Sequence, residues 1–136
     1  MKKLFIFVPI FFLIACLCGA TATAQENISL VGTWVGSAEI VTDQSFSASS
    51  MTMVVTKQQG RAFYGTIRFG EGTPFAINGV YCGSNIQLTG SVSTFTGELL
   101  PIDLTEVKVI TGTGSKIASE SLGAMTVVYQ LYYISS

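Results

Sequence analysis

Residues 30–40 read Leu30-Val31-Gly32-Thr33-Trp34-Val35-Gly36-Ser37-Ala38-Glu39-Ile40 and contain the only tryptophan of the chain. Successive side chains of a β-strand point to opposite faces, so Trp34, Ala38 and Ile40 would share one face while Thr33, Ser37 and Glu39 would share the other. This alternation predicts a strand whose Trp34 face points into a core.

Seven further segments show the same period of two and are separated by turn residues such as Gly and Asn. They comprise residues 51–56, 63–69, 75–82, 86–93, 95–99, 106–113 and 125–134. Eight short strands joined mostly by tight turns favour an all-β fold, a single eight-stranded antiparallel up-and-down barrel. A β-sandwich is the alternative, because alternation does not say whether the first and last strands pair.

Some details of this prediction can be checked residue by residue. Val92 is expected to point inward and Ser93 outward, and the seventh segment is expected to point Val107 and Val109 inward. Two longer connections, residues 42–50 and 114–123, are expected to be mobile loops.

The N-terminal residues 1–24 have the features of a secretory signal peptide, which leaves residues 25–136 as the barrel domain. Lys2 and Lys3 precede an apolar run over residues 4–17, and Ala22-Thr23-Ala24 matches a signal peptidase site. The run is shorter than the roughly 20 apolar residues of a membrane-spanning helix. Cleavage after Ala24 predicts a secreted, extracellular or periplasmic protein.

A second processing site competes with the first. Leu13-Ile14-Ala15-Cys16 resembles the lipobox of prokaryotic lipoproteins, which implies lipidation of Cys16 and a protein anchored at the cell surface. If Cys16 and Cys18 leave with the signal, Cys82 is the one remaining cysteine. A buried thiol is expected there, and dimer formation through Cys82 is the alternative. Asn27-Ile28-Ser29 matches a glycosylation sequon, whose occupancy depends on the host.

The charge balance excludes two classes of partner. The chain has seven Lys and Arg against eight Asp and Glu, and two of the lysines lie in the signal. Without a basic patch, nucleic acid is not an expected partner, and the domain is not expected to bind an acidic membrane surface by charge.

Few residues could support catalysis. The chain has no histidine, which removes the Ser-His triad and most zinc sites. The carboxylates that could form a hydrolytic pair, Glu39 with Asp43 and Glu98 with Asp103, are interpreted as surface charges. The run from Thr111 to Lys116 lacks the spacing of a phosphate loop and is interpreted as the end of a hairpin. No cofactor, metal site or catalytic residue is predicted.

The predicted inner faces combine glycines with aromatic residues. Mid-strand glycines either let strands bend around a narrow barrel or leave room for a ligand. The glycines in these rows are Gly36, Gly65, Gly79, Gly90 and Gly97. If they do leave room, the speculative ligand-binding residues are Trp34, Phe63, Phe75, Tyr81, Phe95 and Tyr129.

Gly32-Thr33-Trp34 on a first strand, followed by seven more strands, resembles the calycin-type barrels, the lipocalins and avidins. This resemblance implies that Trp34 lies across the closed end of the barrel. No Arg or Lys follows Met125 to match the arginine of lipocalins, and one tryptophan does not match the several of avidins, so no ligand residue is carried over. Residues 30–70, including Val31-Gly32-Thr33-Trp34-Val35-Gly36, also resemble a group of small secreted prokaryotic proteins, several of them archaeal.

These observations predict an exported, non-enzymatic barrel that binds a small apolar or amphipathic ligand or presents its loops to a partner. A secreted inhibitor or adhesion module acting through its loops is the alternative. An enzyme similar to barrel cyclases or isomerases, using Glu39, Glu98 and Asp103, is the third hypothesis.

Overall fold

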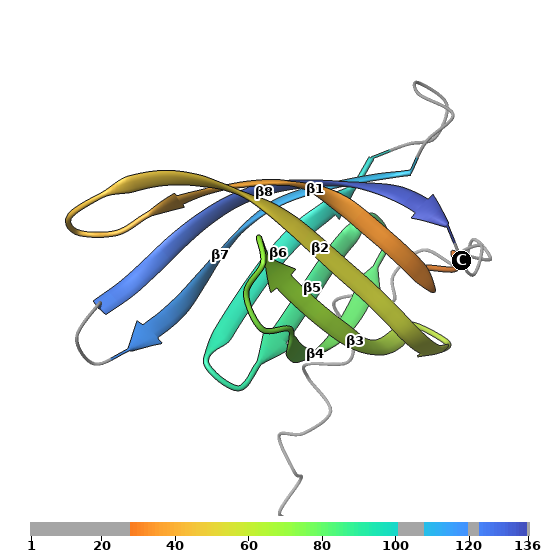
Figure 1. Cartoon of the computed structure of the whole chain (residues 1–136). Coiled ribbons are helices and arrows are strands. Elements are labelled where there is room, and N and C mark those ends of the chain that lie inside the picture. Colours follow the sequence, from red (N-terminus) through yellow and green to blue (C-terminus); the bar gives the residue numbers. More distant parts are fainter. Residues whose placement is uncertain (1–27, 101–107, 120–122, 136) are drawn as a thin grey trace, which may run out of the picture.

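A computed structural model describes residues 28–100, 108–119 and 123–135 of the 136-residue chain. These residues form an all-β structure in which every neighbouring pair of strands is antiparallel (Figure 1). The strands are β1 (Gly32–Val41), β2 (Phe46–Gln59), β3 (Ala62–Phe69), β4 (Phe75–Cys82), β5 (Asn85–Gly90), β6 (Ser93–Leu99), β7 (Val109–Ser119) and β8 (Gly123–Ser135). The predicted signal peptide, Cys16 and Asn27 lie outside the described residues.

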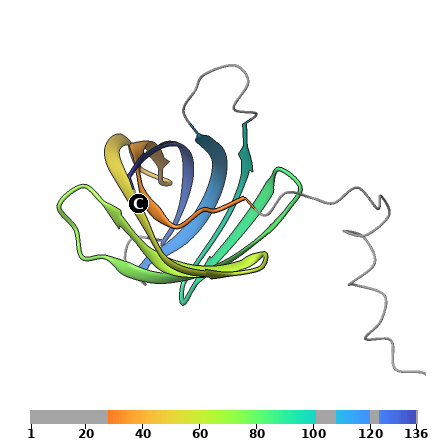
Figure 2. The ribbon, with the colours of Figure 1, turned by 90° about the vertical axis from the view of Figure 1, so that its right-hand side faces the viewer.

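The first and last strands pair and close the barrel. Trp34 of β1 lies opposite Met53 of β2 on one side and Tyr133 of β8 on the other. Each remaining strand pairs with its neighbours in chain order, so the strands run around a common axis (Figure 2). This pairing confirms the predicted barrel and excludes the β-sandwich.

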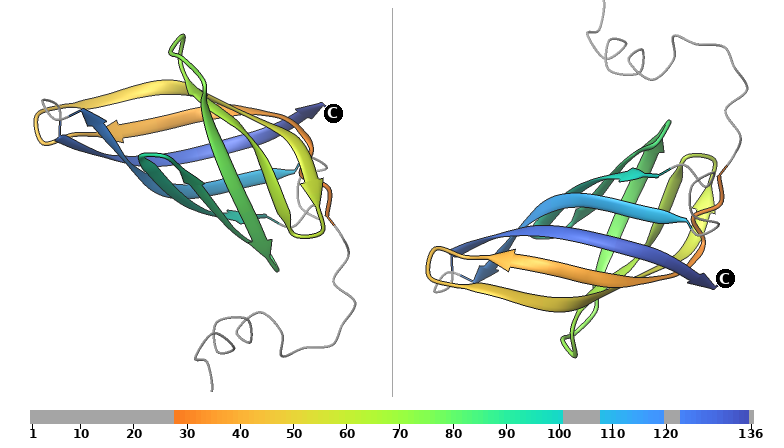
Figure 3. Two further views of the ribbon diagram at one scale, coloured as in Figure 1. Left: turned by 90° about the horizontal axis from the view of Figure 1, so that it is seen from below. Right: turned by 90° about the horizontal axis from the view of Figure 1, so that it is seen from above.

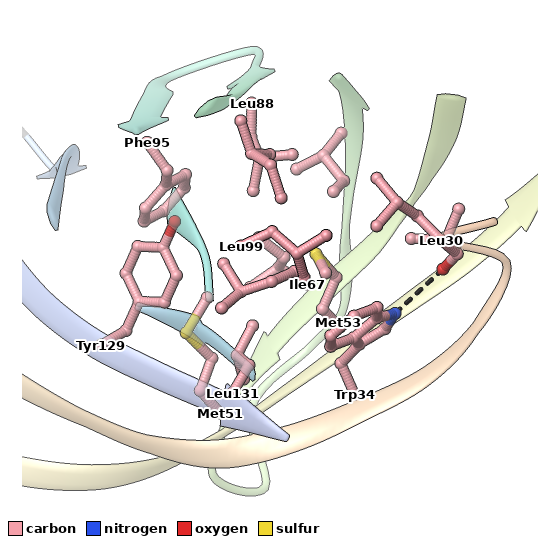
Figure 4. Packing of buried hydrophobic residues seen from close by; sticks show 14 of the residues in the cluster. Leu30, Trp34, Met51, Met53, Ile67, Leu88, Phe95, Leu99, Tyr129 and Leu131 are labelled. Carbon is pink, nitrogen blue, oxygen red and sulfur yellow. Dashed lines mark hydrogen bonds between the residues drawn. The ribbon is translucent and has the colours of Figure 1, made fainter. Parts of the chain in front are cut away.

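The alternation of side chains is as the sequence predicts over most of the barrel. Trp34, Met53 and Leu131 are buried, whereas Thr56, Val128 and Gln130 are exposed on the outer face. Buried apolar side chains from all eight strands form one cluster (Figure 4). Removing a large apolar side chain from water contributes roughly 1.5–3 kcal/mol, so this core holds the fold together.

The connection expected over residues 42–50 is wrong, because β2 already begins at Phe46. The turn is short and is held by the Thr42 hydroxyl, which accepts hydrogen bonds from the backbone N–H groups of Gln44 and Ser45. The Thr42 N–H donates to the Ser45 carbonyl at 2.9 Å. A threonine that satisfies turn amides in this way allows a tight hairpin where the serine content suggested a loop.

The expectations for the seventh segment are also wrong in part. β7 begins at Val109 and runs to Ser119, and β8 begins at Gly123, so most of the loop expected over residues 114–123 is strand. Val109 is buried but lies outside the core cluster, whereas Ile110 belongs to it. Val107 lies outside the described residues.

A turn at residues 91–92 reverses the faces expected for Val92 and Ser93. β5 ends at Gly90 and β6 begins at Ser93, so the two-residue turn restarts the alternation. Val92 is therefore exposed and Ser93 is buried. Cys82, at the end of β4, is partly buried and disulfide-bonded, which differs from the thiol expected from sequence. The other two cysteines lie outside the described residues.

Candidate functional site

One end of the barrel, here named the Trp34 end, is closed by residues 28–31. The Trp34 indole N–H donates to the Leu30 carbonyl at 2.9 Å (Figure 4). Leu30 and Trp34 are both fully buried, and Ile28 and Val31 pack against the core. Trp34 is thus completely covered at this end of the barrel.

Gln58 and Lys108 hold this segment in place. The Gln58 amide oxygen accepts from the Leu30 N–H at 2.7 Å, and its amide nitrogen donates to the Ile28 carbonyl at 2.8 Å. The Lys108 ammonium donates to the Ser29 carbonyl at 3.0 Å and lies 5.0 Å from the centre of the Tyr133 ring. These contacts come from β2 and from the residue preceding β7, so the segment is tied to the strands on either side of the β1–β8 pair.

The six predicted interior residues do not surround one cavity. Trp34 has its ring contact with Tyr133, at 5.2 Å between centroids. At the opposite end Phe95 contacts Phe75 and Tyr129, with centroids 6.4 and 6.0 Å apart. Phe63 and Tyr81 are buried on β3 and β4. The structure therefore brings Phe75, Phe95 and Tyr129 together and places Trp34 apart from them.

The interior around these residues is filled by side chains. Trp34, Met51 and Phe95 have no surface that a water molecule could touch, so no water-sized space adjoins them. A Cβ on Gly79 would collide with the Phe63 ring, and one on Gly114 would collide with the Phe95 ring. These two glycines make room for the rings of this chain, and not for a ligand.

Tyr129 carries a polar group into this apolar core. Its hydroxyl donates to the Thr96 carbonyl at 3.1 Å. Burial raises the pKa of Tyr129 from 10.0 to about 12, because the phenolate would lose its hydration. The hydroxyl therefore stays protonated and acts as a donor that joins β8 to β6.

The other end of the barrel, here named the Phe75 end, exposes part of an aromatic cluster. Phe69 and Phe75 are half-buried, with ring centroids 6.1 Å apart, and each lies 6.4 Å from the fully buried Phe95. Phe69 was predicted on the inner row of its strand but was not singled out as a binding residue. It joins the aromatic cluster because it lies at the end of β3, with its ring stacked on that of Phe75 at the start of β4.

Ser93 adds a hydroxyl at the Phe75 end that no sequence pattern revealed. Its Oγ is buried and has no hydrogen-bond partner among the described residues. A Cβ placed on Gly90 would collide with this Oγ and would lie 3.6 Å from Phe75 Cδ2. Ser93 and Phe75 therefore meet at the bare backbone of Gly90.

The remaining chemical groups are dispersed. Among the described residues, no three His, Cys, Asp or Glu side chains lie close enough to hold a metal ion. Glu39, Asp43 and Glu98 are exposed, and Glu98 accepts from the Ser84 hydroxyl at 3.4 Å. Asp103 lies outside the described residues. The run from Thr111 to Lys116 is an interior part of β7, so its interpretation as the end of a hairpin is wrong.

The chain matches no protein family model, no curated protein and no solved structure. The closed, eight-stranded antiparallel barrel is compatible with a calycin-like fold. None of the described residues belongs to a helix long and apolar enough to cross a membrane.

Proposed function

We propose that this protein is an exported, non-enzymatic binding module that takes an apolar or amphipathic ligand at the Phe75 end of the barrel. The observation that carries the proposal is the cluster of Phe69, Phe75 and Phe95. Two of these rings are half-buried, whereas Trp34, Met51 and Phe95 have no exposed surface. The binding surface is therefore the end of the barrel, and not the tube itself.

The chemistry of this end favours a ligand with an apolar body and one polar group. The rings of Phe69 and Phe75 offer apolar surface, which gains binding energy when water is displaced from it. The Ser93 hydroxyl is a buried polar group that has no partner in the described part of the chain, and such groups gain from a new hydrogen bond. A small rearrangement of Phe75 beside Gly90 would bring a ligand's polar atom within reach of Ser93.

Export and the absence of catalysis are parts of the proposal that rest on sequence. The basic and apolar N-terminal residues support export, either as a secreted domain beginning at Gln25 or as a lipoprotein beginning at Cys16. In the domain beginning at Gln25, Cys82 has no other cysteine in the same chain, so its disulfide would have to join two copies. The mass of the N-terminal peptide of the protein recovered from cells distinguishes the two. The lack of histidine and the dispersed carboxylates support a non-catalytic role.

The ligand site is tested by titrating the purified protein with the amphipathic dye 1-anilinonaphthalene-8-sulfonate. We expect its emission to rise with the original protein and to fall at least about threefold with Phe75→Ala. Tyr64→Ala is the matched control, because it removes an exposed aromatic side chain from the outer face of β3, where its neighbour Phe63 is buried. Trp34 emission reports that each variant is folded, because this tryptophan is fully buried. Equal dye emission from Phe75→Ala and the original protein would overturn the proposal.

A second candidate function is an inhibitor or adhesion module that acts through its hairpins. It is favoured by the β1–β2 hairpin, whose Phe46 is 86% exposed. Replacing Asp43 and Gln44 by Gly-Ser, together with Phe46→Ser, would reduce recovery of a partner from culture medium if this function holds. Unchanged recovery would count against it.

A further inference from the structure

The β1–β2 hairpin is longer than the strand that neighbours it. β2 pairs with β1 from Phe46 onward, but its pairing with β3 starts only at Met51, opposite Phe69. One further hydrogen bond, from the Gly70 N–H to the Ser50 carbonyl at 2.8 Å, ends the contact on that side. In both views of Figure 3 the hairpin (orange to yellow) lies at one extreme of the barrel, beside the ends of β7 and β8 (blue). Residues 46–49 therefore form a free strand edge.

The direction of the edge groups follows from two hydrogen bonds. The Thr42 N–H donates to Ser45 across the hairpin, and the Gly70 N–H donates to Ser50 from the β3 side. In an antiparallel ladder the backbone groups of alternate residues point to the same side. The N–H and C=O groups of Phe46 and Ala48 therefore point away from β1. No described strand pairs with Phe46 or Ala48 on that side.

This edge lacks the features that usually prevent strands from pairing. Exposed edges in soluble proteins are commonly protected by charged side chains, proline or a bulge. Phe46-Ser47-Ala48-Ser49-Ser50 contains neither charge nor proline, and its pairing with β1 shows no register shift. The backbone N–H and C=O groups of this edge are therefore able to pair with another extended strand.

The side chains of the edge form a protruding ring and a hollow that are complementary in shape. Phe46 and Ala48 lie on the outer face, because their partners on β1 are Val41 and the exposed Glu39. A shallow hollow of about 330 Å³ is lined by Glu39, Val41, Phe46 and Ala48 together with Ile40 and Ser47. The edge thus carries both a protruding ring and a hollow beside the small Ala48 side chain.

We infer that this edge binds a second copy of the chain, in an antiparallel strand pair with its two-fold axis at Ser47. This register places Phe46 of each copy opposite Ala48 of the other, and the two pairs exchange four backbone hydrogen bonds. Each Phe46 ring then lies over the partner's hollow. A two-fold contact satisfies the free backbone groups of both copies at once, whereas an unrelated peptide would satisfy one.

Charge does not oppose this contact. Glu39 on β1 is the ionised side chain that lines the hollow. β2 of both copies separates the two Glu39 residues, and three strand spacings amount to about 14 Å. This distance exceeds the Debye length of about 8 Å at physiological ionic strength, so their repulsion is screened.

The inference is tested by sedimentation velocity of the purified protein over a range of concentrations. We expect a shift from monomer to dimer as the concentration rises. Ala48→Pro removes the outward N–H and should raise the dimer dissociation constant at least about tenfold. Ala48→Thr keeps this donor on the same strand and is the matched control, with dimerisation within about threefold of the original protein. Trp34 emission verifies folding of both variants.

A second measurement needs no variant. The amide protons of Phe46 and Ala48 should exchange more slowly as the protein concentration rises, while those of Ser47 and Ser49, which face β1, should not change. A monomer at every concentration, equal dimerisation of Ala48→Pro and Ala48→Thr, or open-ended oligomers in place of a dimer would overturn the inference. Phe75 lies on β4, and β3 separates it from β2, so Phe75 does not belong to this edge. Phe75→Ala should therefore leave dimerisation unchanged, which separates this test from that of the ligand site.

Discussion

At the scale of single residues, the barrel interior is built from aromatic rings that lie against glycines. Phe63 occupies the space beside Gly79, and Phe95 occupies the space beside Gly114. A Cβ added to Gly97 would lie only 2.6 Å from the Tyr129 hydroxyl oxygen, which is too close for both to fit. A larger residue at these positions would compete with a ring for the same volume, so ring and glycine depend on each other.

Tyr129 makes the stability of the protein depend on alkaline pH. Its pKa is about 12 when folded and near 10.0 when unfolded, so the unfolded state loses the proton first. This contribution is fully present below pH 10 and is lost as the pH rises to 12, by about 2–3 kcal/mol in the free energy of unfolding. The free energies of unfolding of the original protein and of Tyr129→Phe, measured by denaturant titration, should therefore become more similar as the pH rises from 10 to 12. A constant difference between them would contradict the assignment.

The sequence predicted which residues are buried better than what they do. Period-two alternation identified Trp34, Phe95 and Tyr129 as interior residues, because burial follows directly from the face of a strand. Alternation could not show that aromatic rings fill the space beside the glycines, because these rings come from neighbouring strands. It also misplaced Ser93, because a two-residue turn changes the face without changing the composition.

At the scale of strands, two glycines allow neighbouring backbones to approach closely. A Cβ on Gly36 would collide with the Gln130 carbonyl of β8, and one on Gly65 would collide with the Val54 carbonyl of β2. A register shift in β2 between Val55 and Lys57 lies beside Gly65. Bare backbone and bulges are common where strands bend sharply in a barrel, which supports the bending role over the ligand role at these two positions.

Gly36→Ala should therefore destabilise the protein strongly. The added methyl group meets a carbonyl oxygen that is fixed by the β1–β8 pairing, so the strands must separate, at about 1–3 kcal/mol or more. Gly60→Asn is the control, because Gly60 has a φ of 58° in open space and asparagine tolerates that conformation. Thermal unfolding measures both. Equal melting temperatures for the two variants would show that the close approach is not constrained.

Strand existence was predictable and strand ends were not. Alternation extends over several residues and survives small errors, whereas an end is set by local hydrogen bonds such as those of Thr42. The free edge of β2 depends on the relative lengths of two strands. No pattern within residues 46–50 alone could have shown it.

At the scale of the whole molecule, closure makes each strand depend on two others. Every strand, including β1 and β8, has a hydrogen-bonded neighbour on both sides. Removing any one of them breaks two ladders, which favours unfolding as a single unit.

Denaturant unfolding should therefore give one transition for the whole barrel. Trp34 emission reports on one end, and far-ultraviolet circular dichroism reports on all strands. We expect both signals to have the same midpoint. Separate midpoints would mean that the Trp34 end and the remaining strands unfold independently.

Both described termini of the barrel lie at the Trp34 end, which determines how the molecule would be oriented when attached to a membrane or to another domain. Ile28 is bound by Gln58 at the Trp34 end, and Ser135 pairs with Thr33 at that same end. A lipid, an affinity tag or a fused domain joined before Ile28 would therefore attach below the barrel. The aromatic cluster and the β1–β2 hairpin lie at the other end of the barrel, so both would face away from the attachment.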